Sequence, residues 1–290
     1  MTVPRSPPPP GPRPDGGSAE ADHFRRCDGL TLLHWPILET LGVQAVVTTR
    51  FGGVSTGPYH SLNLGLHVGD DPAAVAENRR RAAAAIGVGL GDLVIGEQVH
   101  GRAATVLEDD SCGRGTLDPD DAVPATDALV TSSMSLVLVT LVADCVPIVL
   151  FDPVARVLAT VHAGWRGTAS GVVAAALEAM RTLGARPGST VAGIGPAVSP
   201  DTYQVGDDVH RAFERSFNER TLDERLLVPI APGRWLADLP RANRLALIDA
   251  GVPAGSVHLT ATPTGPRGPF FSDRATRPCG RFGLLARITE

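Results

Sequence analysis

Two reactive side chains stand at the ends of two consecutive apolar segments of the sequence. Cys145 lies between LVTLVAD and VPIVLF, and His162 directly follows VLATV. A cysteine and a histidine held close together can act as a nucleophile and its base, or both can bind a metal ion. A single cysteine or histidine in an apolar strand is usually inert, so the pair alone leaves a structural role open.

A second histidine, His100, occupies a similar position, in the segment EQVHG at the end of a predicted strand. Together with Cys145 and His162 it would provide three ligands and leave a fourth coordination position for water or substrate. This is the arrangement of a catalytic zinc site rather than a structural one. The separations of 45 and 17 residues match no local zinc-binding motif. A zinc site therefore requires the fold to bring three strand ends together.

The same residue types allow two other kinds of site. One cysteine and two histidines resemble a blue-copper set, which normally adds a weak axial methionine. Nothing in the sequence positions Met134 or Met180 for that role, so copper is disfavoured. A metal-free cysteine nucleophile with a histidine base would use the same residues.

The chain contains 26 residues of the lysine and arginine types, and every one of them is arginine. The absence of lysine excludes Schiff-base catalysis, a P-loop and a protein kinase. A side-chain cation that binds phosphate must therefore be an arginine. We expect Arg50, in a Gly-rich loop after a predicted strand, and Arg166, beside the start of a predicted helix, to bind phosphate. Asp144, next to Cys145, is a further candidate for the substrate site.

The elements that position these residues follow from the hydrophobic pattern. Strands are predicted at 44–49, 93–99, 103–107, 128–131, 135–142, 146–151 and 157–162, and from weaker signals at 190–194, 257–260 and 282–288. Helices are predicted at 72–86, from about 168 to 183, 207–217 and 239–250. Almost wholly apolar strands are typical of sheets covered on both faces, so the pattern indicates a layered domain of α and β elements. Pro147 is expected to kink its strand.

Composition separates a Pro-rich segment from the rest of the chain. Residues 1–22 are predicted to form a disordered tail, and residues 30–290 a single domain.

The net charge of −5 argues against a nucleic-acid partner, and no apolar run is long enough for a membrane span. Four cysteines without a CxxC pair, and an N-terminus without the apolar region of a secretory signal, favour a reducing compartment. We therefore expect a cytoplasmic protein with small-molecule partners, and the sequence indicates no oligomeric state.

Seven short motifs occur in the order found in one protein family. They are TRFGGVS at 49–55, SLNLG at 61–65, QVHG at 98–101, ATDA at 125–128, ADC at 143–145, HAGWRG at 162–167 and GP at 195–196. With these motifs the chain resembles the YfiH-like family, variously called polyphenol oxidase (laccase domain), purine nucleoside phosphorylase or peptidoglycan editing factor.

The resemblance implies an α+β fold, a layered sandwich of mixed β-sheets flanked by helices. It also implies a zinc site whose ligands fall on His100, Cys145 and His162. The implied activities are phosphorolysis of adenosine, inosine, guanosine and methylthioadenosine, and deamination of adenosine, so a nucleoside and phosphate would be the partners. The family's other names keep two alternatives open, a peptidoglycan-precursor editing factor and a copper-dependent polyphenol oxidase.

The chain departs from the family's motifs at two places. Gln204 stands where the family has glutamate, and Asp273 stands where it has tyrosine. Neither residue is an implied zinc ligand. We expect these two changes to affect substrate preference rather than metal binding.

Overall fold

Two six-stranded β-sheets form the centre of the structure. The computed structural model describes residues 22–217 and 226–289 of the 290-residue chain. The first sheet has the order β1-β2-β3-β15-β7-β4, and only β4 and β7 run parallel. Its strands are β1 (His23–Cys27), β2 (Leu30–His34), β3 (Val43–Thr48), β15 (Phe282–Ile288), β7 (Val137–Val142) and β4 (Leu93–Ile95).

The second sheet is also mixed, with the order β14-β10-β8-β9-β6-β5. The pairs at its two edges are parallel and the inner pairs antiparallel. Its strands are β14 (Val257–Leu259), β10 (Val191–Ile194), β8 (Val146–Asp152), β9 (Val157–Ala163), β6 (Ala128–Thr131) and β5 (Ala104–Val106). A small third sheet joins β11 (Gln204–Val205), β13 (Arg234–Ala237) and β12 (Leu227–Ala231).

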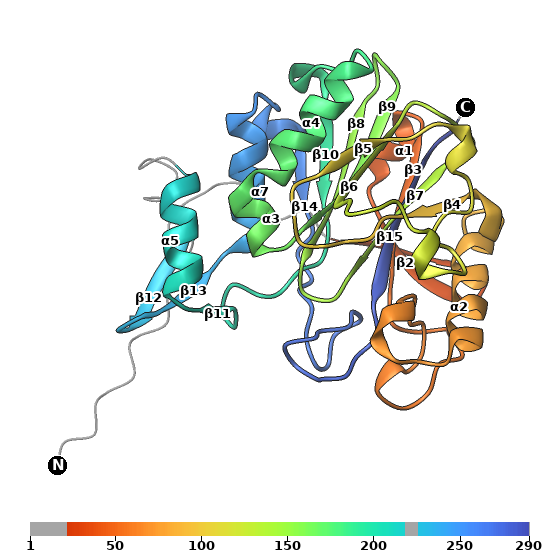
Figure 1. Cartoon of the computed structure of the whole chain (residues 1–290), viewed down its shortest axis with the longest axis horizontal. Coiled ribbons are helices and arrows are strands. Elements are labelled where there is room, and N and C mark those ends of the chain that lie inside the picture. Colours follow the sequence, from red (N-terminus) through yellow and green to blue (C-terminus); the bar gives the residue numbers. More distant parts are fainter. Residues whose placement is uncertain (1–21, 218–225, 290) are drawn as a thin grey trace.

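The two large sheets pack face to face around an apolar layer. This layer includes Val47 and Leu284 from the first sheet and Phe151 and Leu158 from the second. Helices cover the outer faces (Figure 1), so strands β7, β8 and β9 are apolar on both sides and every residue of these three strands is buried. The α+β sandwich of mixed sheets flanked by helices, predicted above, is confirmed.

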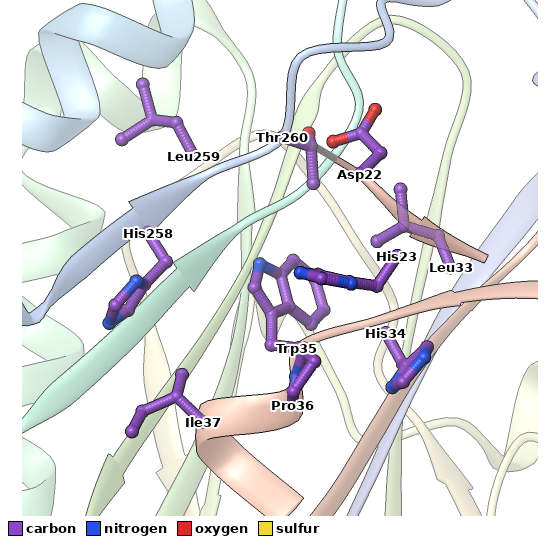
Figure 2. A pocket seen from close by; sticks show the side chains of 10 residues that line it. All are labelled: Asp22, His23, Leu33, His34, Trp35, Pro36, Ile37, His258, Leu259 and Thr260. Atoms are coloured by element: carbon purple, nitrogen blue, oxygen red, sulfur yellow. The ribbon is translucent and has the colours of Figure 1, made fainter. Parts of the chain in front are cut away.

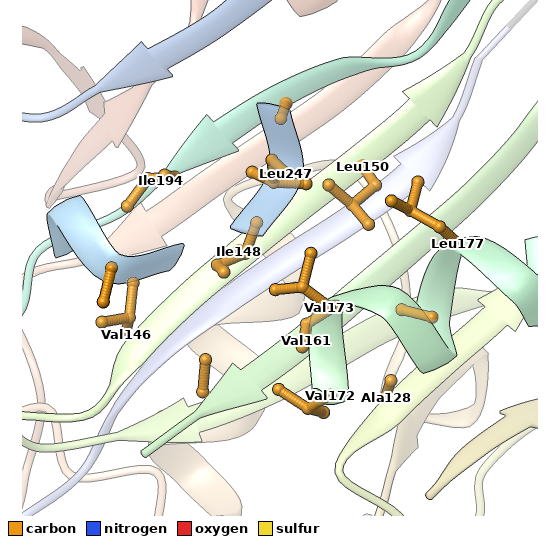
Figure 3. Packing of buried hydrophobic residues seen from close by; sticks show 14 of the residues in the cluster. Ala128, Val146, Ile148, Leu150, Val161, Val172, Val173, Leu177, Ile194 and Leu247 are labelled. Carbon is orange, nitrogen blue, oxygen red and sulfur yellow. The ribbon is translucent and has the colours of Figure 1, made fainter. Parts of the chain in front are cut away.

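The described residues form six α-helices. They are α1 (Pro36–Thr40), α2 (Pro72–Ala84), α3 (Trp165–Ser170), α4 (Val172–Thr182), α5 (Asp207–Ser216) and α7 (Leu239–Asp249). α2 packs on the first sheet, whereas α4 and α7 pack on the second. Figure 3 shows the contact on the second sheet between apolar side chains of the helices, Val172, Val173, Leu177 and Leu247, and those of the strands, Ile148, Leu150 and Val161.

Three sequence expectations about local structure are corrected. The helix predicted from about residue 168 to 183 is two helices, because Gly171 adopts a left-handed conformation with φ of 84° between them. The strand predicted at 93–99 ends at Ile95. Pro147 does not kink β8, which pairs with β9 without a register shift. Pro147 has no N–H to donate, but no hydrogen bond of the β8–β10 ladder is lost, because β10 has ended at Ile194. The Pro147 carbonyl still accepts the N–H of Gly195 at 2.8 Å.

The start of the described chain belongs to the fold. The predicted tail, residues 1–22, lies outside the described residues except for Asp22. The Asp22 carboxylate accepts the backbone N–H groups of Ala261 and Thr262, each at 2.7 Å. Among residues 22–217 and 226–289, no helix has the length and apolar character needed to cross a membrane.

Candidate metal centre

The fold brings His100, Cys145 and His162 together. One ligand atom from each of the three side chains lies within 4.8 Å of the other two. His162 lies near the end of β9, and Cys145 directly precedes β8, the neighbouring antiparallel strand. His100 lies in the loop after β4, where its backbone has a positive φ of 61°. The three side chains therefore meet as expected, but His100 comes from a loop and not from a strand end, because β4 ends at Ile95.

Asp127 connects two of these three residues. Its Oδ1 accepts a hydrogen bond from Nδ1 of His162 at 2.8 Å and from the backbone N–H of His100 at 3.0 Å. Its Oδ2 accepts the N–H of Gly101 at 2.7 Å. Burial raises the pKa of Asp127, but the hydrogen bond and charge of His162 and the two N–H groups outweigh burial, and the net pKa lies below the usual range.

An ionised Asp127 fixes the tautomer of His162. A carboxylate can only accept, so Nδ1 of His162 carries the hydrogen and Nε2 is left for the cluster. The second ring nitrogen of a metal-bound histidine is commonly held in this way by a carboxylate. Sequence reasoning missed Asp127, although the ATDA motif at 125–128 places a carboxylate directly before an apolar strand.

Gln98 fixes the loop that carries His100. Its Nε2 donates to the carbonyl of Leu141 at 2.7 Å, and its Oε1 accepts the N–H of Leu141 at 2.8 Å. β4 ends at Ile95, and the side-chain amide of Gln98 then bonds the backbone of β7 as a neighbouring strand would. The segment of β7 that leads toward Cys145 therefore also holds the loop of His100.

Charge and hydrogen bonding favour a thiolate at Cys145. Burial raises the pKa of Cys145, but the positive charge of His162 and hydrogen bonds from His100 and His162 outweigh it, and the net pKa lies well below the usual range. Burial lowers the pKa of His162, but the charge of Cys145 and the bond to Asp127 outweigh it and raise the net pKa. A thiolate is the form of cysteine that binds a metal ion or attacks an electrophile.

Close packing around the cluster leaves no room for a side chain at Gly164. A Cβ atom on Gly164 would lie 3.0 Å from Cys145 Sγ and 3.0 Å from Cδ2 of His100. The first glycine of the HAGWRG motif is therefore required by the close approach of the backbone to both side chains.

A cavity of about 330 Å³ opens onto all three residues. Its remaining walls are contributed mainly by the segment before α2, the end of β4 with the loop after it, the loop between β5 and β6, and the end of β7. The lining residues are Leu66, His67, Arg79, Ile95, Gly96, Glu97, Gln98, Gly115, Pro119, Ala122, Leu141, Val142, Ala143 and Arg281. The cavity therefore combines apolar walls, the His–Cys–His cluster and two arginines that sequence reasoning did not select.

The two arginines selected from the sequence are not among the lining residues of this cavity. Arg50 donates from Nε and Nη2 to the carbonyl of His60, at 3.3 and 3.1 Å, and its guanidinium lies 4.7 Å from the ring centre of Phe271. Arg166 is exposed, and its guanidinium stacks on Trp165 at 4.3 Å. Their role in phosphate binding stays a prediction.

Asp144 holds the backbone around Cys145 in place through hydrogen bonds to two other loops. Its backbone has a φ of 91°, and its carboxylate accepts hydrogen bonds from Thr264 Oγ1 and from the N–H of Arg274. These bonds attach two distant loops to the residue that precedes Cys145. No bond from Asp144 to His100, Cys145 or His162 is found among the described residues.

The two departures from the family's motifs lie in different surroundings. Gln204 pairs with Leu236 in the small third sheet and does not line the cavity. Asp273 forms an ion pair with Arg281, a lining residue, at 3.2 Å. Asp273 is therefore the departure that has a direct contact with the cavity wall.

The donor set fits a zinc ion. One thiolate and two imidazole nitrogens are typical zinc ligands, and a cavity in front of them leaves a fourth position accessible. Neither internal methionine supplies a copper-type axial ligand. Met134 contacts Arg156, and Met180 is buried in the core beneath α4.

A second, smaller cavity contains three histidines but no comparable cluster. It has a volume of about 70 Å³ and is lined by Asp22, His23, Leu33, His34, Trp35, Pro36, Ile37, His258, Leu259 and Thr260. Figure 2 shows His23, His34 and His258 placed around Trp35 rather than directed at one point. Within the part of the chain that the structure describes, only His100, Cys145 and His162 form a group of three converging metal-ligand side chains.

Comparison with known proteins shows extensive similarity. The profile of the family described as "Multi-copper polyphenol oxidoreductase laccase" matches residues 44–289. "Purine nucleoside phosphorylase YlmD" of Geobacillus stearothermophilus is 38% identical over 241 residues, covering 81% of this chain and 86% of that protein. Its crystal structure superposes on this chain with a TM-score of 0.87 at 35% identity, covering 93% of this chain and 100% of that one. "Adenosine deaminase RL5" from an unknown prokaryotic organism is 37% identical over 217 residues, covering 74% of this chain and 82% of that protein.

Proposed function

Because this chain belongs to the family described as multi-copper polyphenol oxidoreductase laccase, the YfiH-like family of its motifs, we propose that it is a zinc-dependent purine nucleoside phosphorylase. Its substrates would be adenosine, inosine, guanosine and methylthioadenosine, with deamination of adenosine as a side activity. The observation that carries the proposal is the His100–Cys145–His162 cluster, supported by Asp127 and open to a cavity of about 330 Å³.

The cavity suits a small flat ligand with polar groups. Its volume lies at the lower end of the range for small-molecule sites. Ile95, Leu141 and Val142 provide apolar walls on which a purine could lie, and charged side chains stand among them. A nucleoside placed here would contact the cluster directly.

Each residue around the cavity would have a separate role in phosphorolysis. Phosphorolysis forms a bond between a phosphate oxygen and C1′ of the ribose and breaks the bond from C1′ to the base, whose nitrogen takes the electron pair and then a proton. A bound zinc ion would supply Lewis acidity toward substrate or water. His100, Cys145 and His162 would hold it, Asp127 would accept the hydrogen on Nδ1 of His162 so that Nε2 faces the ion, and the apolar walls would exclude water.

A second candidate is favoured by one observation. Asp127, His162 and Cys145 form a continuous series of the kind that activates a cysteine nucleophile without metal. A copper oxidase is supported less, because a multi-copper array needs several ligand clusters and residues 22–217 and 226–289 contain one. A role in editing peptidoglycan precursors would use the same cavity, and no contact in it favours that substrate.

The proposed reaction is expected in the cytoplasm. All four cysteines are free, as is usual in a reducing compartment. A nucleoside and inorganic phosphate would be the partners, and no nucleic acid or membrane is part of the proposal.

One experiment tests the proposed function. The protein is purified without chelator, its metals are quantified, and it is incubated with adenosine in the presence and absence of phosphate while adenine and inosine are followed. We expect about one zinc ion per chain and adenine release that requires phosphate. Stoichiometric copper without base release would contradict the proposal, and full activity in metal-free protein would favour the cysteine nucleophile.

A further inference from the structure

Arg79 is a buried cation that no carboxylate pairs with in the described part of the chain. Its side chain lines the cavity, and only 3% of the residue is exposed. Nε donates to the carbonyl of Leu64 at 2.8 Å, and Nη1 donates to the carbonyls of Gly115 and Thr116 at 2.8 and 2.6 Å. Among residues 22–217 and 226–289, no acidic group forms an ion pair with Arg79 and no protein group bonds its Nη2.

A charge in this position is costly unless an anion accompanies it. Burial lowers the pKa of Arg79 to about 10, so the guanidinium is still charged at neutral pH. Backbone carbonyls satisfy three of its hydrogen-bonding directions but do not neutralise its charge. An unpaired buried cation beside a ligand cavity therefore indicates an anionic ligand.

Arg281 reaches the same cavity from the other side of the segment that Arg79 holds. The N–H of Leu64 donates to the carbonyl of Arg281 at 2.9 Å, while Asn63 Oδ1 accepts the N–H of Arg281 at 2.8 Å. The stem of Arg281 occupies the space that a side chain at residue 65 would need, since a Cβ on Gly65 would lie 2.8 Å from its Cγ. Both arginines thus contact the SLNLG motif, and both line the cavity.

Charged side chains of both signs lie around this cavity. Desolvation lowers the pKa of His67, and the charges of Arg281, Arg79, His100 and His162 lower it further. Two carboxylates lie nearby. Asp273 pairs with Arg281 at 3.2 Å, and Glu97 lines the cavity and accepts the N–H of Ala125 at 2.9 Å.

We propose that Arg79 and Arg281 bind the inorganic phosphate that attacks the nucleoside. The assignment rests on the proposed phosphorylase function for the identity of the anion. Arg79 can donate from Nη2, which no described group bonds, and Arg281 can donate from the N–H groups left after Nη1 bonds the carbonyls of Cys279 and Gly280 and Nη2 bonds Asp273. Both can therefore form charge-assisted hydrogen bonds to the oxygens of one tetrahedral anion. Phosphate bound there shares one cavity with His100, Cys145 and His162, so that both reactants lie in the same enclosed space. Arg50 and Arg166 lack this arrangement, because neither lines the cavity.

The proposal is tested first by removing the charge of Arg281. Arg281→Gln is compared with Arg287→Gln, a control on β15 whose guanidinium bonds Gln44. The Kd for inorganic phosphate is measured by calorimetry on the protein as purified, alone and with inosine present, and KM is measured for phosphate and adenosine. We expect Arg281→Gln to raise the Kd and KM for phosphate about tenfold or more, with a smaller change in the KM for adenosine and no loss of zinc. Arg281→Lys should restore part of the affinity.

A second variant moves Arg281 without removing a charge. Gly65 has a φ of −92°, which alanine also adopts, so Gly65→Ala adds a methyl group against the stem of Arg281. It should also raise the Kd for phosphate. Arg79→Gln serves as a third variant only if its unfolding transition remains cooperative, since Arg79 also holds three carbonyls.

The outcomes separate this inference from the proposed function. Base release with an unchanged phosphate Kd and KM in both Arg281→Gln and Gly65→Ala overturns the arginine assignment and leaves the phosphorylase standing. Phosphate binding that requires Arg281, without base release, keeps the anion site and removes the phosphorylase. No phosphate binding, alone or with inosine, or a Kd that responds to Arg166→Gln instead, also overturns the assignment.

Discussion

The Asp127 carboxylate lies 2.8 Å from Nδ1 of His162, and the same oxygen accepts the backbone N–H of His100. One buried side chain therefore sets the ring orientation of one candidate ligand and the backbone position of another. Because His100 has a positive φ, its loop depends on such an external bond more than an extended strand would.

This relationship predicts a weakened metal site in Asp127→Asn. The amide has one acceptor and one donor group, so it cannot accept from His162, His100 and Gly101 together, as the carboxylate does. We expect metal affinity to fall about 10–100-fold while the protein stays folded. Competition with a chelator of known affinity measures the change. Asp201→Asn, at an exposed position, is the control and should keep the affinity of the unsubstituted protein.

Cys145→Ala should lose both metal and activity. It removes the thiolate of the cluster, and two imidazoles alone hold zinc weakly. Metal content after extensive dialysis and phosphate-dependent adenine release are measured side by side. The exposed cysteine variant Cys112→Ala is the matched control and should match the unsubstituted protein in both. Full metal retention in Cys145→Ala would show that the ligand assignment is wrong.

The sequence predicted the central strands well because they are buried on both faces. Apolar runs identify β6 and β15 to the residue, and β8 and β9 to within one residue at one end. β1 was missed because this edge strand, HFRRC, exposes most of its residues and has no apolar face to signal it. The position of β15 between β3 and β7 was also beyond prediction, since it depends on pairing between distant segments.

Some residues of the candidate site could be predicted from the sequence, and others could not. The three cluster residues could be predicted because each stands at the end of an apolar run or beside glycine. Arg79 was missed because it is the first of three consecutive arginines, of which Arg80 and Arg81 are exposed and pair with Glu77. Helical spacing was the signal available: Val75, Arg79 and Ala82 lie on one face of α2, and all three are buried. The hydrogen bonds of Asp127 and Gln98 depend on tertiary contacts that no local pattern contains.

Asn78 holds the Gly-rich loop that carries Arg50. Its Nδ2 donates to Ser55 Oγ and to the carbonyls of Ser61 and Asn63, and its Oδ1 accepts the N–H of Val54 at 2.8 Å. Asn78→Ala leaves these buried groups unpaired and should lower the free energy of unfolding by about 2–4 kcal/mol. Urea denaturation measures the loss. The exposed substitution Arg80→Ala on the same helix should change it by less than about 0.5 kcal/mol. A loss in Asn78→Ala no larger than in this control would mean that the loop is held by other contacts.

Asp152 should make the stability of the fold sensitive to acid. Burial raises its pKa, but hydrogen bonds from the N–H of Arg186, from Ser189 Oγ and from the N–H groups of Val154 and Ala155 outweigh burial, and the net pKa lies below the usual range. A carboxyl group with a lowered pKa in the folded state contributes its full stabilisation above its unfolded pKa of about 3.9, and loses it as the pH falls through the folded value.

Asp152→Asn is therefore expected to be less stable than the unsubstituted protein by about 1–3 kcal/mol at pH 7. The same difference should persist at pH 5, because Asp152 is ionised in both the folded and the unfolded state there. At pH 3 and below the difference should shrink, because protonation removes the advantage of the carboxylate. Urea denaturation at the three pH values measures it, with the exposed Asp201→Asn as a control that should show no measurable difference. A difference that stays constant down to pH 3 would show that the hydrogen bonds of Asp152 do not depend on its charge.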